Sequence, residues 1–448
     1  MKAIVTVLLV SFSAATLAQT PTGKAPDPAP ATNRVQLTAT YITSLAEEMR
    51  GKSPALQAAR ARTNAAAANV GTVRTWDDPM ARLGGMAARE DMRASEGDLI
   101  YGVEQKLPLF GKPNFARRVA RAELSTETAN ADYQFQILRR ELAKAVFRTA
   151  LVDEVVVIGQ QDLGWLETIA RTMEGKYRAS EATLVEVLQL QNERAKQATQ
   201  LETERDRLTH ERVSVNRMLN RGLLSPWPTL ELPALARPVH YSGGLVDLAL
   251  KHEPRIQMML QQIKQAGAAV DLTRRQRYPD VNAGLEMRNY TGDGSFRQGM
   301  LVFSMNVPWV NAGKYRSEIQ RDEAKLKAAE LDLTDYELSV REEVHMLTVK
   351  IDAARREALL YRDQIIPRSQ SALDSARSGW EANRNTFRDV LDARRMLLEG
   401  RLMYARALSE QYQMLSELVL CCGLGDMEAL QMIGATAEVP PEEKTNPK

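Results

Sequence analysis

The sequence predicts a mostly α-helical α+β membrane protein, in which long coiled-coil helical hairpins are joined to two β-hairpins and the whole plan is duplicated. Each half contains one pair of segments with alternating apolar and polar residues, and the rest has the Ala-, Leu-, Glu- and Arg-rich composition of long helices. The halves repeat at an offset of 200 residues, since Pro54, Pro79 and Pro108 recur as Pro254, Pro279 and Pro308. A repeat this long is a duplicated half and not a solenoid unit of about 20 to 50 residues.

Composition and the chain ends limit the class of protein. Of 448 residues only 6% are aromatic and 26% are charged, with a net charge of +2, so no basic footprint for nucleic acid is present. Residues 1–18 read as a secretory signal peptide cleaved after Ala18, followed by a Pro-rich segment over 19–41. We expect a C-terminal tail over 424–448 that is disordered at its end.

The two structural repeats are expected at 42–222 and 244–423, separated by a Pro-rich linker at 223–243. Each opens with a helical stretch, 43–76 or 244–277, and continues into a β-hairpin at about 80–107 or 280–307. Long helices follow at 114–173 and 316–378, with returning helices at 183–220 and 386–422. Gly222 and Gly423 are expected to cap the returning helices, and Pro367 is expected to kink or break the second long helix.

The alternating segments have two interpretations. They fit a half-buried soluble sheet or strands that cross a membrane with one face in lipid. The long helical context favours the membrane, because no compact apolar core is available to cover a sheet. Four strands cannot close a barrel, for which about eight is the minimum, so several chains would have to pool their hairpins.

In these features the chain resembles the TolC family of outer-membrane efflux proteins, the outer-membrane factors of tripartite efflux systems. The resemblance is carried by two strand-to-helix passages and by two turn motifs that end at Val187-Leu188 and Val390-Leu391. The passages contain Pro108 with Gly111 and Pro308 with Gly313.

The resemblance implies a homotrimer in the cell outer membrane, with one shared twelve-stranded β-barrel and a periplasmic helical tunnel. It implies a passive exit duct that opens at its periplasmic tip. The implied partners are a periplasmic adaptor (membrane fusion) protein, an inner-membrane efflux pump of the resistance-nodulation-division type and outer-membrane lipid, with no nucleic acid.

The same resemblance places a gate at the two turn motifs. The family pattern has an aromatic residue followed three positions later by Gly; here Tyr177 and Trp380 are followed by Ser180 and Asn383. The family's gating contacts fall on Glu186, Trp380 and Asn385, with Arg384 adjacent. A Glu186–Arg384 ion pair between adjacent hairpins is the resulting hypothesis. The alternative is that Glu186, Arg384 and Asp389 are ordinary solvated charges at helix ends.

No enzymatic signature is present, and we expect no catalytic residue, cofactor or bound metal. The four histidines lack metal-ligand spacing, and there is neither a phosphate-binding loop nor a nucleophile elbow. A periplasmic coiled-coil adaptor or structural scaffold remains the alternative function. The exported substrate stays open: Met80, Met86 and Met92 are compatible with a soft-metal exporter or with simple gap filling. Cys421 and Cys422 are expected to close the last helix as a small apolar pair.

Overall fold

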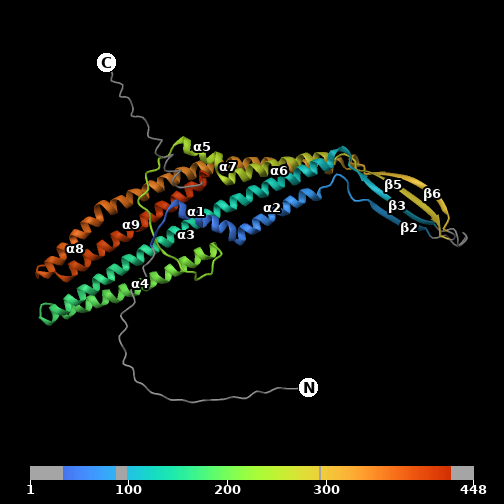
Figure 1. The fold of residues 1–448 in the computed structure, drawn as a ribbon. Coiled ribbons are helices and arrows are strands. Elements are labelled where there is room, and N and C mark those ends of the chain that lie inside the picture. Colours follow the sequence, from blue (N-terminus) through green and yellow to red (C-terminus); the bar gives the residue numbers. More distant parts are fainter. Residues whose placement is uncertain (1–33, 87–97, 292–293, 425–448) are drawn as a thin grey trace, which may run out of the picture.

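The computed structural model describes residues 34–86, 98–291 and 294–424. The molecule is elongated, with the strands at one end and the tips of two long helical hairpins at the other (Figure 1). The expected signal peptide, residues 19–33, Met92 and the tail beyond Leu424 lie outside the described residues.

Each half begins with two short helices where the sequence predicts one. The first half has α1 (Ala39–Lys52) and α2 (Pro54–Thr72), and the second has α5 (Gly243–His252) and α6 (Pro254–Gln276). The prediction of single stretches at 43–76 and 244–277 is therefore wrong. The break falls at Ser53 and Glu253, whose ψ angles are 124° and 123°, because a proline disfavours helical backbone in the residue before it.

The two β-hairpins join into one antiparallel sheet in the order β2-β3-β5-β6. These strands are β2 (Met80–Met86), β3 (Asp98–Leu107), β5 (Val281–Tyr290) and β6 (Phe296–Met305). β3 pairs with β5, so the junction between the hairpins is a full ladder, and β2 and β6 are left as the two edges. A Cβ atom on Gly102 would lie 2.5 Å from the carbonyl oxygen of Leu285, so β3 and β5 approach each other here at a distance that only glycine permits.

A second, short sheet was not expected from the sequence. β1 (Arg34–Gln36), from the Pro-rich segment, pairs in parallel with β4 (Thr229–Glu231), from the linker. Leu230 is buried in the central apolar core, and its backbone N–H donates to Asp153 Oδ2 at 3.1 Å. The burial of the Leu230 side chain and the hydrogen bond of its N–H to Asp153 therefore order the linker. Its prolines had led us to expect an irregular segment.

The large sheet exposes its apolar face. Leu83 on β2 and Leu301 and Phe303 on β6 are 84%, 71% and 72% exposed, respectively. A soluble sheet would bury such side chains at a favourable free energy of roughly 1.5–3 kcal/mol each. Their exposure makes this face complementary to an apolar surrounding and not to water.

The opposite face of the sheet is polar and contains buried charges. Asp98 accepts two hydrogen bonds from Arg297 Nη1, at 2.7 and 2.8 Å. Glu104 accepts a hydrogen bond from the Ser304 hydroxyl at 2.9 Å and pairs with Arg82. The charged residues of the strands therefore compensate one another on the side away from the apolar face.

The two strand-to-helix passages differ in backbone conformation. Pro108 leads into the 3₁₀ turn η1 (Leu109–Gly111), where Phe110 and Gly111 have φ angles of 60° and 69°. Pro308 begins the 3₁₀ turn η2 (Pro308–Asn311), and Gly313 already lies within the following helix. The two passages are therefore similar in sequence but differ in backbone conformation.

Two long helical hairpins extend from these passages. The first is α3 (Lys112–Arg178) with α4 (Leu184–Met218). The second is α7 (Ala312–Leu360), the π-helical turn η3 (Tyr361–Ile365), α8 (Ile366–Glu381) and α9 (Phe387–Cys421). At 1.5 Å per residue, the 67 residues of α3 span about 100 Å. No helix within the described ranges is long and apolar enough to cross a membrane.

The glycine predicted to end the returning helix is confirmed in the second half only. Gly423, with a φ angle of 61°, follows α9 as predicted. After α4 the left-handed residue is Asn220, with a φ angle of 54°, and the prediction of Gly222 as the cap is wrong. Asparagine tolerates this conformation because its short polar side chain bonds locally.

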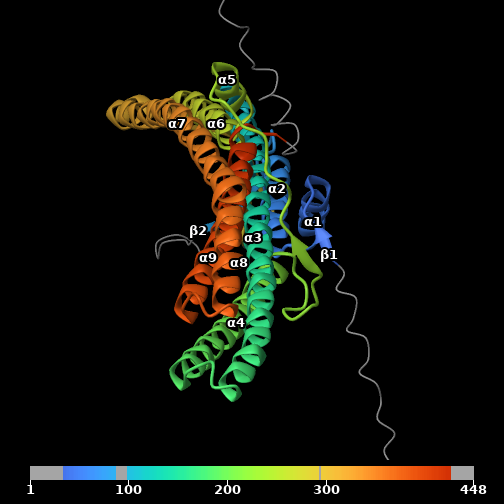
Figure 2. The same cartoon turned by 90° about the vertical axis from the view of Figure 1, so that its left-hand side faces the viewer.

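Apolar packing is divided between the middle of the molecule and the hairpin tips. The central core joins α1, α3, α5, α7, α9 and the linker, and it includes both cysteines. Burial raises the pKa of both thiols, that of Cys422 to about 12. The tip cluster joins α3 and α4 to α8 and α9. Helices α8 and α9 run side by side in Figure 2.

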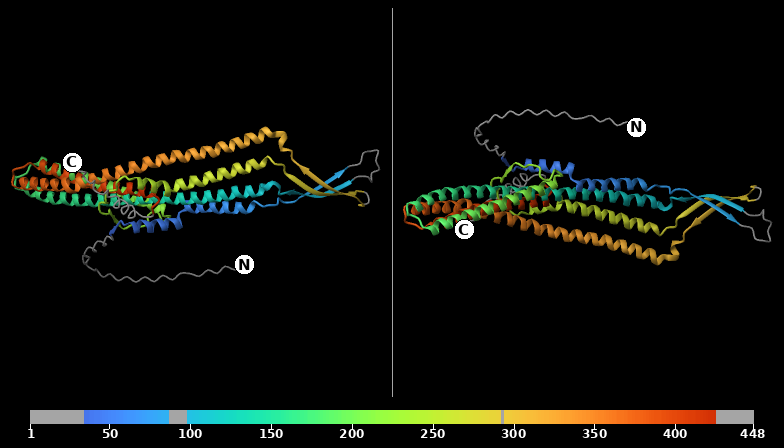
Figure 3. Two further views of the ribbon diagram at one scale, coloured as in Figure 1. Left: turned by 90° about the horizontal axis from the view of Figure 1, so that it is seen from above. Right: turned by 90° about the horizontal axis from the view of Figure 1, so that it is seen from below.

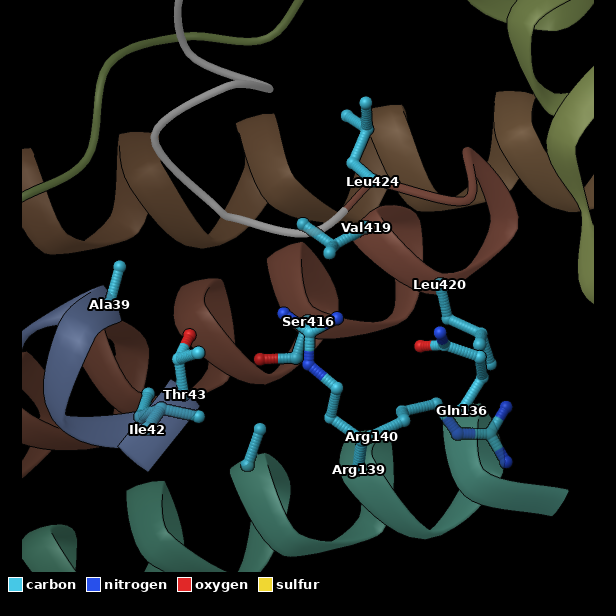
Figure 4. Close-up of a pocket in the computed structure, with 11 residues that line it drawn as sticks. Ala39, Ile42, Thr43, Gln136, Arg139, Arg140, Ser416, Val419, Leu420 and Leu424 are labelled. Atoms are coloured by element: carbon cyan, nitrogen blue, oxygen red, sulfur yellow. The ribbon is translucent and has the colours of Figure 1, made fainter. Parts of the chain in front are cut away.

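A small pocket opens beside the central core, between α1, α3 and the end of α9 (Figure 4). It is lined by apolar side chains such as Ile42 and Val419 and by the polar Gln136 and Arg140. The pocket is remote in sequence from both turn motifs and contains none of the predicted site residues.

Candidate functional site: the tips of the helical hairpins

The two turn motifs form the same backbone structure. Ser180 and Asn383 both lie in the left-handed region, with φ angles of 61° and 57°. In each turn the next residue donates its N–H back across the helix end, from Glu181 to Lys176 O at 2.8 Å and from Arg384 to Gly379 O at 2.7 Å. Replacement of the family's glycine by Ser and Asn therefore preserves the turn, at a cost of about 1–2 kcal/mol for the Ser backbone.

Glu186 and Asp389 cap the helices that leave the turns. Thr183 donates its N–H to Glu186 at 2.8 Å, and Thr386 donates its N–H to Asp389 at 3.0 Å. Each threonine hydroxyl in turn accepts from the backbone N–H of the same acidic residue, which completes a capping box. The bonds from Thr386 lower the pKa of Asp389. Both acids are thus held in their own turns as helix caps. The spacings Thr-x-x-Glu and Thr-x-x-Asp are the sequence signal of such a capping box, and we did not predict it.

The predicted Glu186–Arg384 ion pair is not formed within the described part of one protomer. Glu186 is already engaged by Thr183, and Arg384 has no ion pair among the described residues of this chain. A contact between protomers stays a prediction.

The two aromatic residues of the motifs have different environments. Trp380 is 4% exposed and lies 5.5 Å from the Phe387 ring, whereas Tyr177 is 46% exposed. The side chain of Asn385 covers the backbone of Gly379, since a Cβ there would lie 2.5 Å from the amide nitrogen. Trp380 and Asn385 therefore stabilise the second turn from within.

Lys176, which the sequence analysis did not identify, links the two tips of one protomer. Its Nζ donates to Asn383 Oδ1 at 2.9 Å and to the carbonyl oxygens of Trp380 and Glu381 at 3.4 and 3.3 Å. The ammonium also lies 5.1 Å from the Trp380 ring centroid. A cation at the C-terminal carbonyls of α8 is favoured by the helix dipole, so the end of α3 is bonded to the end of α8.

A second link lies further from the tips. The guanidinium of Arg394, on α9, bonds Asp162 on α3 at 2.7 Å and lies 3.5 Å from Glu193 on α4. Arg394 is almost fully buried, and the exposed Arg395 also pairs with Glu193. We call Lys176, Asp162, Glu193 and Arg394 the tip latch. Its signal in the sequence is the single Arg394 within the apolar face formed by Val390, Leu391 and Leu397.

The first turn of α4 carries an exposed apolar patch. Leu184, Val185 and Leu188 are exposed there, near the exposed Tyr177. The equivalent positions of Leu184 and Leu188 on α9, Phe387 and Leu391, are buried in the tip cluster. The two turns have the same backbone but differ in their surfaces, because at these two equivalent positions only the first hairpin presents exposed apolar side chains.

The duplicated architecture matches a known family. A family model described as outer membrane efflux protein matches the chain twice, over residues 45–221 and 245–424. The chain belongs to the outer membrane efflux protein family. The predicted resemblance to TolC-family channels is confirmed, as is the mostly helical fold class.

Individual relatives are distant in sequence and similar in fold. The cobalt-zinc-cadmium resistance protein CzcC of Cupriavidus metallidurans is 24% identical over 178 residues, and this match spans 40% of the chain and 42% of CzcC. The outer-membrane channel OprN superposes with a TM-score of 0.73 at 19% identity, over 86% of this chain and 90% of OprN. CusC superposes with a TM-score of 0.75 at 14% identity, over 86% and 92% of the two chains.

Family membership establishes the class and location of this efflux protein. Proteins of the family are outer-membrane channels with a large periplasmic helical portion, and they are not enzymes. They form trimers and work with adaptors and inner-membrane pumps. A family match in both halves favours a channel over the alternative of an adaptor or scaffold.

Proposed function

We propose that this family member is the passive exit duct of a tripartite efflux system, conducting substrates through the outer membrane. The observation that carries the proposal is the reversed polarity of the sheet, whose apolar face is exposed and whose charges lie on the opposite face. β3, β5 and β6 have 10 residues each, which matches the roughly 9–11 residues of a membrane-spanning strand.

Three protomers complete the duct. The edge strands β2 and β6 have backbone groups that lipid cannot satisfy, so we infer that β6 of one protomer pairs with β2 of the next. Three copies of four strands then give the twelve-stranded barrel. The exposed Leu331 and Leu338 on α7, seven residues apart, supply an apolar stripe for the same neighbour.

The orientation follows from the two ends of the molecule. With the strands in the membrane, the charged helices extend into the periplasm and the hairpin tips lie furthest from the membrane (Figure 3). We propose that the tips are the gate, formed by the residues of the two turns together with the tip latch. The turn residues are Tyr177, Ser180, Glu186, Trp380, Asn383, Arg384, Asn385 and Asp389.

The partners are proposed on the same basis. A periplasmic adaptor docks at the tips, where the apolar patch of α4 is available, and delivers substrate from a pump of the resistance-nodulation-division type. Divalent heavy-metal ions are the substrate class to test first, because CzcC is a cobalt-zinc-cadmium resistance protein. Among the described residues no group of three or more His, Cys, Asp or Glu is placed to hold a metal ion.

The decisive experiment combines fractionation with electrophysiology. The protein should remain with outer membranes after carbonate extraction, sediment as a trimer in mild detergent and form ion-conducting pores in planar bilayers. Release by carbonate as a stable monomer with full strand content would overturn the duct and favour the adaptor or scaffold.

A further inference from the structure

The second copy of the repeat contains one residue more than the first between equivalent landmarks. From Lys112 to Tyr177 the sequence advances 177 − 112 = 65 positions, and from Lys314 to Trp380 it advances 380 − 314 = 66. Both intervals lie in the outward helices of the two hairpins. The extra residue must therefore be accommodated within a helix that packs like its counterpart.

The burial pattern locates the extra residue. At an offset of 202, each buried residue of α7 from Val344 to Ala358 falls on a buried residue of α3, from Leu142 to Val156. Beyond this point the match is at 203, where the buried Ser369 and Ala376 fall on the buried Leu166 and Met173. The register therefore changes between residues 358 and 369 of the second hairpin.

The π-helical turn η3 lies at this change of register. A π turn spans one residue more than an α turn, so it accommodates an insertion and leaves the packing on both sides unchanged. η3 covers Tyr361–Ile365 and has no buried residue. The corresponding part of the first hairpin is uninterrupted helix, since α3 runs without a break from Lys112 to Arg178.

The surroundings of η3 permit bending. Pro367 follows two residues later and has no N–H to close the helical ladder. Gly400 on α9 faces Ile365 and Ile366, with its would-be Cβ 3.5 Å from each. The central core ends on α9 at Leu408 and the tip cluster begins at Leu397, so η3 lies at the junction between two separately packed units.

A groove separates this junction from the first hairpin. Ile366, Arg401 and Tyr404 form its wall on the second hairpin, and Ile158 and Gln161 form its wall on α3. Close packing of α8 against α3 begins only nearer the tip, in the apolar cluster and the tip latch. On the side of the first hairpin, motion at η3 would thus be directed into this groove, while on the other side Ile365 and Ile366 pack against α9.

We propose that η3 is the hinge of the gate. The first hairpin stays fixed, and the part of the second hairpin beyond η3, residues 366–397, moves about the π turn when the tip latch releases and the apolar contacts of the tip cluster between the hairpins loosen. This inference rests on the proposed function of the tips as a gate, but the hinge itself is a local mechanical property that is measurable without transport.

The test removes the extra residue. Deletion of Gln364 together with Pro367→Ala converts the segment to continuous α-helix in the register of α3, and Pro367→Ala alone is the matched control that retains the insertion. Both are combined with the unlatched variant Lys176→Ala/Arg394→Ala. Single-channel conductance in planar bilayers should rise about tenfold or more on unlatching, remain high in the control and return to within about twofold of the wild type in the deletion. Equal conductance of the unlatched channel with and without the extra residue would overturn the hinge.

Hydrogen exchange provides a second measurement on the unmodified trimer. Amides of residues 361–366 should exchange at least tenfold faster than those of 159–164 in α3, because a π turn holds its hydrogen bonds less well. Equal protection of the two segments would overturn the hinge even if the deletion variant did not assemble. Fast exchange at η3 together with no conductance in any variant would instead contradict the proposed gate and leave the hinge in place.

Discussion

Lys176 Nζ lies 2.9 Å from Asn383 Oδ1, so the left-handed residue of the second turn is bonded to the last turn of the first hairpin's outward helix. The equivalent of Lys176 in the second copy is Gly379, so the bond has no counterpart in the duplication. The two tips of one protomer are joined by an asymmetric contact, and this asymmetry suggests where the gate is controlled.

Loss of the Lys176 contact should favour the open channel. Lys176→Met keeps the length of the side chain but removes the donors to Asn383 and to the α8 carbonyls. We expect conductance in planar bilayers to rise about tenfold or more if the three copies release together. Lys196→Met, at an exposed position of α4, is the control and should leave conductance unchanged; equal conductance of both variants would contradict a latch at Lys176.

Arg394 should contribute to stability as well as to closure. Arg394→Ala leaves Asp162 and Glu193 without their buried partner, which typically destabilises a protein by about 3–5 kcal/mol. Helix melting followed by circular dichroism should show a clearly lower Tm for this variant. Arg388→Ala, whose exposed side chain pairs only weakly with Asp392, should shift stability by no more than about 0.5 kcal/mol.

Glu186 allows capping to be separated from charge pairing. Glu186→Gln retains the reach and acceptor of the capping box and removes the charge. If Glu186 pairs with Arg384 of another protomer, this variant and Glu186→Lys should both raise conductance, and Arg384→Glu should partly reverse the effect of Glu186→Lys. If the conductance of Glu186→Gln equals that of the wild type, the ion pair with Arg384 is contradicted and Glu186 acts only as a helix cap.

The proposed orientation is testable by cysteine labelling. The turns at 90–97 and 290–297 should face the cell exterior, and those at 177–183 and 380–386 should face the periplasm. Asp293 and the whole of the first turn lie outside the described residues. A cysteine at Asp293 should react in intact cells with an impermeant maleimide, and one at Asn383 should not. Cys421 and Cys422 should give little background because burial raises their pKa.

Acid should weaken the attachment of α1. Arg221 Nε lies 2.9 Å from Glu48 Oε1, and this hydrogen bond is the main cause that lowers the pKa of Glu48 to about 2. A lowered pKa means that the contribution to stability is complete above the unfolded value of 4.5 and is lost as pH falls toward 2. The difference in Tm between the wild type and Glu48→Gln should therefore be present at neutral pH and vanish at a pH of about 2; a constant difference would exclude the pair as its source.

The sequence was informative where a pattern is local or repeated. Alternation predicted the strands, and the recurrence of Pro108 as Pro308 predicted the duplicated passages. Composition and length predicted the long hairpins, and Pro367 marked the segment where the second outward helix departs from α-helical geometry. Each of these signals reports a backbone constraint that acts over a few residues.

The remaining features depend on contacts between distant residues. Asp162, Glu193 and Arg394 are far apart in sequence and look like members of solvated helix faces until packing buries them. The ordering of the linker by Leu230 could not be predicted either, because the partners of Leu230 lie on α3 and β1, far away in sequence. The change of offset from 202 to 203 was present in the sequence, but only burial on both sides identified it as an insertion held in a π turn.

The parallel pairing of Arg34 with Thr229 also constrains the order of folding. Among the described residues, the strand β1 pairs only with β4 in the linker, and closing so long a loop is slow compared with helix formation. A chain that emerges from a membrane with its N-terminus first must therefore wait until more than half of its length has emerged before β1 can pair. Residues 34–228 must therefore be kept from competing associations during export until β4 emerges and β1 can pair with it.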